Sequence, residues 1–274
     1  FHFFKIQILN IFSRAKRNLP GSMQKNAGTL DDLRDVIERG TRGVIFTGAG
    51  VSTESGIPDF RSPGGVWTKY KPIQFREFIA SEEARRESWR RKFDDSYGFE
   101  GATPNRGHRA IAKLVADGKI SSVITQNTDG LHQESGISQG RVIELHGNST
   151  YAKCIDCGRR HELAAIREDF TKYERLPICG ACGGIVKAAT ISFGQPMPDQ
   201  PMRRAQEEAL GCDFFIVVGS SLKVYPAAGF PEVAAKNGST LAILNREETP
   251  LDPIADLVIH REIGPSLGEV ANVN

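Results

Sequence analysis

The sequence lacks any apolar run of the ~18–20 residues that a membrane-spanning helix needs. It also lacks an excess of charge of either sign: the formal net charge is +2, which predicts no nucleic-acid partner. Internal repeats and low-complexity tracts are missing as well. These absences favour a globular protein that binds neither nucleic acid nor membrane directly, and they leave its oligomeric state open.

Cysteine is scarce, and its number is odd, which argues against the disulfide framework of a secreted protein. Four of the five cysteines form two CxxC pairs, "CIDCG" (154–158) and "CGACGG" (179–184). Two such pairs predict one tetrahedral, structural Zn²⁺ ion with the ligands Cys154, Cys157, Cys179 and Cys182. A pair of redox dithiols is the alternative. Cys212 opens an apolar segment, and we expect it to be a small core residue.

Acidic residues are absent from the first 30 positions, which contain only basic charges. Met23 lies just before the patterned sequence begins, so we expect residues 1–22 to be an N-terminal extension outside the fold. The same composition is compatible with a mitochondrial transit segment. Because no other targeting signal is present, we expect a cytoplasmic protein, with a mitochondrial location as the alternative.

Short apolar segments alternate with longer amphipathic ones along most of the chain. The apolar segments are rich in Val, Ile, Leu and Phe, as are strands buried on both faces of a parallel sheet. We expect strands over 43–50, 121–127, 141–147, 190–194, 213–221, 240–245 and 256–260, and helices over 30–40, 76–93, 105–119 and 199–212. The alternation predicts an α/β fold around a parallel sheet.

The segment 151–186, which contains the paired cysteines, interrupts this alternation. We interpret it as an inserted zinc-binding module. The α/β domain is then discontinuous, over 23–150 and 187–274, with a helical insertion at about 62–110.

A glycine turn, "TGAGVSTESGIPDFRS" (47–62), follows the first expected strand. Gly48 and Gly50 would let backbone N–H groups approach a phosphate, although the spacing matches neither GxGxxG nor a Walker loop. An ordinary strand–turn–helix corner is the alternative. Arg61 could pair with phosphate and Phe60 could cover a flat ring, which favours a ligand site.

Polar residues end several of the other expected strands. Ligands of open α/β sheets bind beyond the carboxyl ends of the strands, so these side chains predict a nucleotide along one edge. They are Gln126, Asn127 and Asp129 in "TQNTDG", Ser220 and Ser221 in "VVGSSL", and Asn245 and Glu247 in "LNREE". Any one of these strand ends alone would be compatible with an ordinary turn.

One histidine, His146 in "IELHG", ends a strand at the same predicted edge. A histidine is the side chain best suited to general base catalysis near neutral pH, although a lone one is more often structural. His132 falls in the helical segment that follows Asp129, and we interpret it as structural or exposed.

These motifs together resemble a known family. "GAGVSTESGIPDFRS", "TQNTDGLH", "ELHGN", the double CxxC, "SFGQ", "GSSLKVYPAA" and "LNRE" occur in the order found in sirtuins, the NAD-dependent protein lysine deacylases. The resemblance covers about residues 28–265. It implies a Rossmann-like parallel sheet domain that binds NAD, and a smaller zinc-ribbon and helical insertion domain.

The resemblance also implies residue roles. The catalytic residues would be His146 as the base, with Asn127 and Asp129 in the nicotinamide pocket. The NAD contacts would be Gly48, Ala49, Gly50, Ser52, Asp59, Phe60, Arg61, Gln126, Asn127, Asp129, Gly219, Ser220, Ser221, Asn245, Arg246 and Glu247. The substrate peptide would lie as an added strand between Gly194–Gln195 and Val224.

The implied reaction is deacylation of acylated-lysine proteins, which releases nicotinamide and O-acetyl-ADP-ribose. Sirtuins that prefer succinyl or malonyl groups carry a Tyr-x-x-Arg pair, and "RRESWRRKFDDSYGFE" (85–100) has none, so we expect acetyl to be preferred. Mono-ADP-ribosyl transfer from NAD is the alternative activity. A non-catalytic nucleotide-binding or zinc-ribbon module needs no base, and a serine hydrolase would need a G-x-S-x-G elbow, which is missing.

Overall fold

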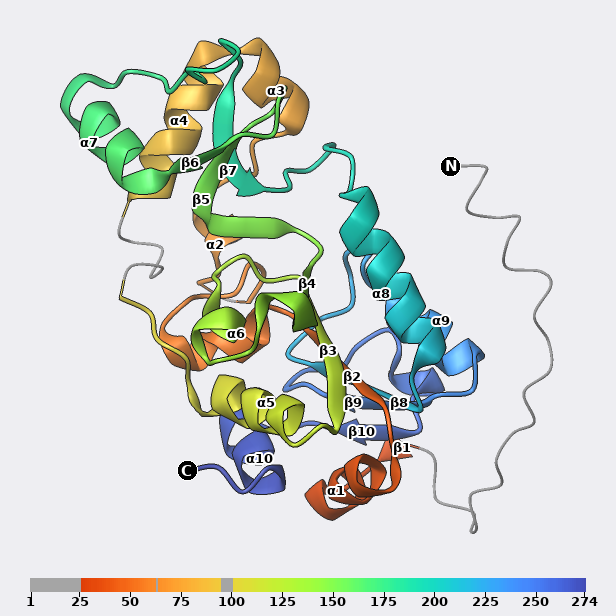
Figure 1. Ribbon diagram of the computed structural model, residues 1–274. Helices are drawn as coiled ribbons and strands as arrows, with labels where there is room; N and C mark the ends of the chain where they lie inside the picture. The colour runs from red at the N-terminus through yellow and green to blue at the C-terminus, as the bar shows by residue number, and fades with distance from the viewer. Residues whose placement is uncertain (1–25, 63, 95–100) are drawn as a thin grey trace.

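A computed structural model describes residues 26–62, 64–94 and 101–274 (Figure 1). The predicted extension 1–22 lies outside the described residues. None of the helices in the described ranges combines the length and apolarity that crossing a bilayer requires.

The larger sheet has seven strands in the order β1-β10-β9-β8-β2-β3-β4, and all neighbouring pairs are parallel. The predicted α/β fold with a Rossmann-like sheet is therefore confirmed. The chain runs outward from β2 to β4 and later from β8 to β10, so the order reverses between β2 and β8. The strands are β1 (Asn26–Ala27), β2 (Gly43–Thr47), β3 (Ile120–Thr125), β4 (Val142–Glu144), β8 (Phe214–Val218), β9 (Thr240–Leu244) and β10 (Leu257–Ile259).

Helices cover both faces of this sheet. Successive strand residues point to opposite sides, so apolar strands present an apolar surface on each face that helices bury. In β2, Ile45 packs with α1 (Leu30–Arg39), α5 (Arg106–Ala116) and α10 (Ile263–Val270). Its neighbours Val44 and Phe46 pack on the other face, with α8 (Asp199–Gly211) and α9 (Gly229–Lys236). Burial on both faces explains why these strands are continuous apolar runs.

A second layer lies at one end of the large sheet, at the top of Figure 1. Its three strands are antiparallel in the order β6-β5-β7, with helices beside them. Trp89 and Phe170 from two of these helices pack on the sheet residues Ala152 and Val186 in a separate core. The elements are β5 (Gly147–Cys154), β6 (Arg160–Glu162), β7 (Val186–Thr190), α3 (Phe75–Ala80), α4 (Glu82–Phe93) and α7 (Leu163–Tyr173).

Two expectations about elements are wrong. The strand expected over 190–194 instead spans Val186–Thr190, and Ser192 and Gly194 belong to a turn. The helix expected over 76–93 is divided into α3 and α4 at Ser81, whose hydroxyl accepts a hydrogen bond from the N–H of Ala84. Ser81 thereby caps a new helix where the apolar spacing alone suggested continuity.

The remaining elements are short and lie in the connections. Those after β2 and β3 contribute directly to the site described below. The remaining elements are the 3₁₀ helices Ala49–Ser55, Gln139–Arg141 and Asp252–Ile254, and the helices α2 (Val66–Lys69) and α6 (Leu131–Glu134).

Candidate functional site

A cleft of about 1410 Å³ opens beyond the carboxyl ends of the central strands and extends to the second layer. It begins at the reversal of strand order between β2 and β8, where ligands of doubly wound sheets bind. The following residues of the predicted site line it: Gly48, Ala49, Gly50, Asp59, Phe60, Arg61, Gln126, Asn127, Asp129, His146, Gly194, Gln195, Gly219, Ser220, Ser221, Val224, Asn245, Arg246 and Glu247.

Two glycine turns meet backbone to backbone at the floor of the cleft. The N–H of Gly48 donates to Val218 O at 3.1 Å, and the N–H of Gly50 donates to Gly219 O at 2.9 Å. A Cβ on Gly50 would lie 2.8 Å from Gly219 O, and Gly219 itself has a φ of +62°. A side chain is therefore excluded at Gly50 and at Gly219, which leaves a surface that a pyrophosphate could approach closely.

The loop after the first glycine turn is held by the carboxylate of Asp59, which belongs to the same loop. The carboxylate of Asp59 accepts hydrogen bonds from the N–H groups of Arg61 and Ser62, at 2.9 and 2.7 Å. Burial opposes ionisation of Asp59, but these hydrogen bonds and the charge of Arg246 outweigh it and lower its pKa. A charged group thus contributes to fixing the loop, beside the apolar packing of its side chains.

Aromatic rings line the cleft wall next to this loop. The rings of Phe60 and Phe193 each lie 5.4 Å from the ring of Trp67, between centroids. The guanidinium of Arg61 lies 4.2 Å from the centroid of Trp67. This wall is largely aromatic, with its rings tilted against one another, and it is suited to keep water away from a reacting group. The sequence pattern predicts a role for Phe60 but not for Trp67 or Phe193. Phe193 belongs to the "SFGQ" motif, and Trp67 lies shortly after the motif that ends in "PDFRS".

The polar residues after β3 bond mainly to other parts of the protein. Gln126 Nε2 donates to Ser220 Oγ at 2.7 Å, which joins the ends of β3 and β8. Asn127 Nδ2 donates to Ser52 Oγ at 3.0 Å, and Ser52 Oγ donates to Asp129 Oδ2 at 2.7 Å. Their hydrogen-bonding capacity is thus partly used before any ligand binds, which fixes their orientation.

Ser52 differs from the other predicted NAD contacts. It is almost fully buried and lies behind Asn127 and Asp129 rather than at the surface of the cleft. Its hydroxyl therefore orients two residues that line the cleft.

His146 lies in the turn between β4 and β5, with its ring in the cleft wall. Nδ1 is 3.0 Å from Gln126 O. Because a carbonyl only accepts, Nδ1 carries the proton in the neutral ring, and Nε2 has the free lone pair. Burial lowers the pKa of His146 below its ordinary value, and the hydrogen bond to Gln126 offsets this only in part. The ring is therefore neutral near pH 7 and able to accept a proton.

The segments expected to hold a peptide both line the cleft. Gly194 and Gln195 form a turn in which the side chain of Gln195 accepts from the N–H of Ser192 at 3.1 Å. Phe75 N donates to Phe193 O at 2.9 Å and ties this turn to α3. Val224 belongs to the connection between β8 and α9. An extended chain between the two segments would meet backbone from both sides.

The end of β9 forms the far side of the cleft. Asn245 Nδ2 donates to Glu247 O at 2.6 Å, which closes a tight turn. Asn245 O lies 2.9 Å from Nδ1 of His260. Arg246 and Glu247 extend from this turn and are exposed at the rim.

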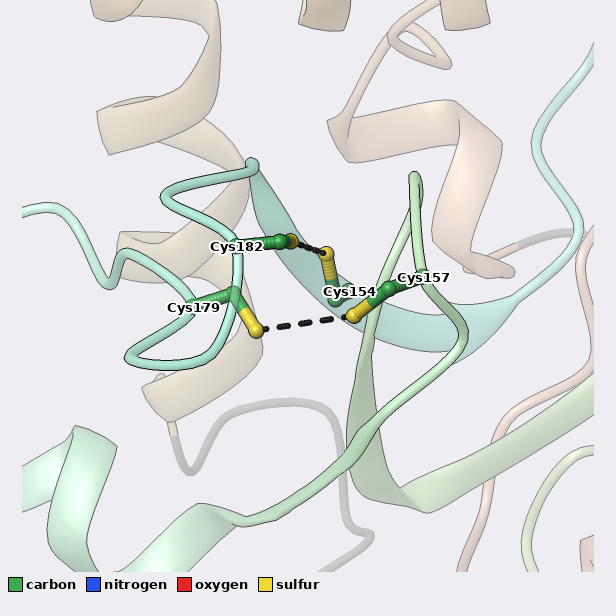
Figure 2. Close-up of side chains that lie close together, drawn as sticks. All are labelled: Cys154, Cys157, Cys179 and Cys182. Atoms are coloured by element: carbon green, nitrogen blue, oxygen red, sulfur yellow. Dashed lines mark hydrogen bonds between the residues drawn. The ribbon is translucent and has the colours of Figure 1, made fainter.

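The four paired cysteines converge at one point of the second layer (Figure 2). Their Sγ atoms all lie within 4.8 Å of one another, with Cys154 and Cys182 at 3.5 Å and Cys157 and Cys179 at 3.7 Å. Four thiolates in such an arrangement fit tetrahedral Zn²⁺ and leave no ligand position open, so the site is structural. Cys212 lies elsewhere, buried in the core of the large sheet, as expected.

The comparisons with known proteins agree on one family. The Sir2 family model matches residues 48–226. An NAD-dependent protein deacetylase of Rhodopseudomonas palustris is 56% identical over 239 residues, which cover 87% of this chain and 94% of that protein. NAD-dependent protein deacetylase 1 of Bradyrhizobium diazoefficiens is 54% identical over the same shares of the two chains.

Solved structures are similar over most of the chain. One described as Sir2 with a p53 peptide and NAD⁺ has a TM-score of 0.79 at 32% identity and covers 89% of this chain and 98% of that chain. Another, from work on the mechanism and regulation of Sir2 enzymes, has a TM-score of 0.77 at 40% identity and covers 89% and 96%. The family model matches most of the chain, two relatives exceed 50% identity, and the solved structures agree. The chain therefore belongs to the Sir2 family.

Proposed function

We propose that this protein is an NAD-dependent protein lysine deacetylase that yields deacylated lysine, nicotinamide and O-acetyl-ADP-ribose. The observation that carries this function is the position of His146. A half-buried, neutral imidazole with a free Nε2 faces the cleft that begins at the glycine turns. The reported relatives are named NAD-dependent protein deacetylases, and they support the same activity.

We propose that NAD lies across the reversal point of the sheet. Its pyrophosphate would lie against the glycine turns at Gly50 and Gly219, where no side chain stands in the way, and its adenosine would extend past Ser220 to the turn at Asn245. The steric exclusion of side chains at Gly50 and Gly219 supports this placement. Bound NAD supplies a ribose carbon that releases nicotinamide and accepts the acyl oxygen of the substrate.

The residues around that ribose would then have separate tasks. Asn127 and Asp129 would orient the ribose and the carboxamide of nicotinamide, and Phe60 would exclude water from the ring. His146 Nε2 would take a proton from a ribose hydroxyl once the acyl oxygen has bonded. The pKa of His146 supports this role because a base must be unprotonated at the working pH.

Zinc has no part in these proton transfers. When bound by the four cysteines, it would hold the end of β5 to the loop before β7 and stabilise the second layer. This layer carries Thr190, which lines the cleft, so its order would affect activity indirectly.

The substrates are peptides and proteins that carry an acylated lysine, and we propose acetyl as the preferred group. Trp89 on α4 is buried in the second core and cannot contact an acyl chain. Arg90 on the same helix pairs with Glu174 and Glu83, at 2.8 and 2.7 Å. Arg91 pairs with Glu87 at 2.6 Å and donates to Lys71 O. These arginines already have acceptors, which supports an uncharged acyl group.

We retain the cytoplasm as the proposed location, in keeping with the bacterial relatives. The mitochondrial alternative depended on residues 1–22, which lie outside the described part of the chain.

A deacetylation assay with and without NAD, on the wild type and on His146→Ala, tests the proposed function. We expect turnover to require NAD and to fall about 10²- to 10⁴-fold in the variant, with NAD binding retained. Peptides with acetyl, succinyl and long acyl groups, assayed side by side, test the acyl preference. ADP-ribose transfer to protein without an acylated lysine would instead favour the alternative activity, and turnover without NAD would exclude both.

A further inference from the structure

His132 is buried beneath the cleft without touching it. The residue belongs to α6, directly after the polar segment that contains Asn127 and Asp129, and its exposed fraction is 1%. Nε2 lies 2.8 Å from Thr47 Oγ1, at the end of β2. A buried imidazole that reaches a strand end next to the site requires an explanation beyond filling space, because an apolar side chain would fill the same space without a desolvation cost.

The contact continues from His132 to the main chain of Asn127. Thr47 Oγ1 donates to Thr125 Oγ1 at 2.8 Å. A hydroxyl has one proton, so Thr47 accepts from the Nε2–H of His132. Thr125 Oγ1 accepts in turn from the backbone N–H of Asn127 at 3.0 Å. Three buried side chains in series, on α6, β2 and β3, thus reach the backbone of Asn127.

A second series returns from Asn127 to α6. Asn127 Nδ2 donates to Ser52 Oγ at 3.0 Å, and Ser52 Oγ donates to Asp129 Oδ2 at 2.7 Å. The other carboxylate oxygen, Asp129 Oδ1, accepts from the N–H of Leu131 at 2.9 Å, and Leu131 precedes His132 in the chain. The two series therefore close into a ring, which we call the His132 circuit: His132, Thr47, Thr125, Asn127, Ser52, Asp129 and Leu131.

The burial of the His132 circuit makes its geometry strict. Thr47, Thr125, Ser52 and His132 are all buried, and only Asn127 and Asp129 of the circuit line the cleft. Hydrogen bonds in such dry surroundings are strong and cannot be replaced by bulk water. Burial, with a smaller effect of the nearby His108, lowers the pKa of His132 to about 3, so the ring stays neutral at any working pH.

We infer that His132 is a positioning residue: through Thr47 and Thr125 it holds the backbone of Asn127, and this in turn keeps the Asn127 side chain and, through Ser52, the Asp129 carboxylate in the orientation that receives the nicotinamide end of NAD. This inference rests on the proposed function, because it takes the roles of Asn127 and Asp129 from there. His132 itself touches neither substrate.

Substitutions at Thr47 and His132 test the inference in matched pairs. Thr47→Val removes the hydroxyl and keeps the shape, whereas Thr47→Ser keeps the hydroxyl. His132→Leu removes the donor, whereas His132→Gln places an N–H near the position of Nε2. The readouts are the Kd of NAD by calorimetry, the inhibition constant of nicotinamide, and kcat and KM with an acetylated peptide, each referred to the folded fraction.

We expect Thr47→Val and His132→Leu to weaken NAD and nicotinamide binding, and to lower kcat/KM for NAD, each about tenfold. The KM of the peptide should stay unchanged, because the peptide segments lie on other elements. Thr47→Ser and His132→Gln should keep values within about threefold of the wild type.

Unchanged ligand binding in the variants would refute the inference. If folded Thr47→Val and His132→Leu bind NAD and nicotinamide as the wild type does, the His132 circuit is structural only and the inference is wrong. Should His132→Leu fail to fold, the Thr47 pair decides. A wild type that binds NAD but releases no deacetylated peptide would refute the proposed function, and the Kd values would still decide about the circuit. A wild type that does not bind NAD would overturn both.

Discussion

The Nδ1 nitrogen of His146 lies 3.0 Å from the carbonyl oxygen of Gln126, so the turn after β4 is tied to the end of β3. This contact selects the tautomer of His146 and directs Nε2 to the cleft. One backbone carbonyl therefore fixes which nitrogen can act as the base, without a carboxylate partner that would raise its pKa.

The pH dependence of turnover follows from this environment. Burial places the pKa of His146 below its ordinary value of 6.5, and the base is active when it is unprotonated. We expect kcat/KM for the acetylated peptide to rise with pH, with its inflection below 6.5, and to be level from there to about pH 8. An inflection above 6.5 that persists in His146→Ala would assign the proton transfer to another group.

Gly147 should tolerate no side chain. Its φ is +74°, and a Cβ would overlap the carbonyl oxygen of Ala189 on β7. We expect Gly147→Ala to lower the free energy of unfolding by about 3 kcal/mol in urea titrations. Gly118→Ala is the control, because Gly118 has a φ of +77° and open space around it, and it should cost only about 1 kcal/mol. Equal costs would mean that the overlap at Ala189 is relieved.

Zinc content should depend on the paired cysteines alone. We expect one Zn²⁺ per chain by elemental analysis, and its loss in Cys154→Ser together with a lower thermal midpoint of unfolding. Cys212→Ser is the matched control, because Cys212 lies in another core, and it should retain the metal. A zinc-free wild type that is as stable as the loaded protein would contradict a structural role.

Lys187 makes stability rise with pH in a narrow window. The side chain is buried on β7, where Nζ donates to Thr190 O at 2.6 Å, and burial lowers its pKa from 10.5 to about 8. Between these values the unfolded chain binds more protons than the folded one. The free energy of unfolding should therefore increase with pH, by up to about 1.4 kcal/mol per unit.

Urea titrations between pH 8 and 10 check this window. Lys187→Met should abolish the increase, because the titrating group is gone. Lys153 on β5 lies opposite Lys187 on β7 in the strand register, but its side chain is exposed. Lys153→Met should therefore retain the increase. The same slope in both variants would assign the effect to other groups.

Local patterns predicted the parts of this protein that depend on short stretches of chain. The CxxC spacing predicted the four-cysteine cluster because both thiolates of a pair reach one ion. The glycine turn and the polar strand ends predicted the cleft because parallel strands end at one edge. His146 was identified because it follows such a strand.

Long-range contacts escaped the same patterns. Nothing in the spacing of "TISFG" shows that the strand ends at Thr190, since its limit is set by pairing with β5. Ser52 resembles a ligand contact in the sequence, yet the fold places it behind Asn127. His132 was interpreted as structural or exposed because its partner Thr47 is far away in the chain. Such contacts exist only once the strands are assembled.

The backbone contact between Gly50 and Gly219 has a consequence for engineering. Because Gly50 and Gly219 have no room for even a methyl group, directed evolution has no side chain to vary at these two positions of the cleft floor. Altered dinucleotide choice would have to be sought at the rim, where Asn245, Arg246 and Glu247 form a replaceable turn. A library confined to those three positions would sample specificity while leaving the glycine turns of the floor in place.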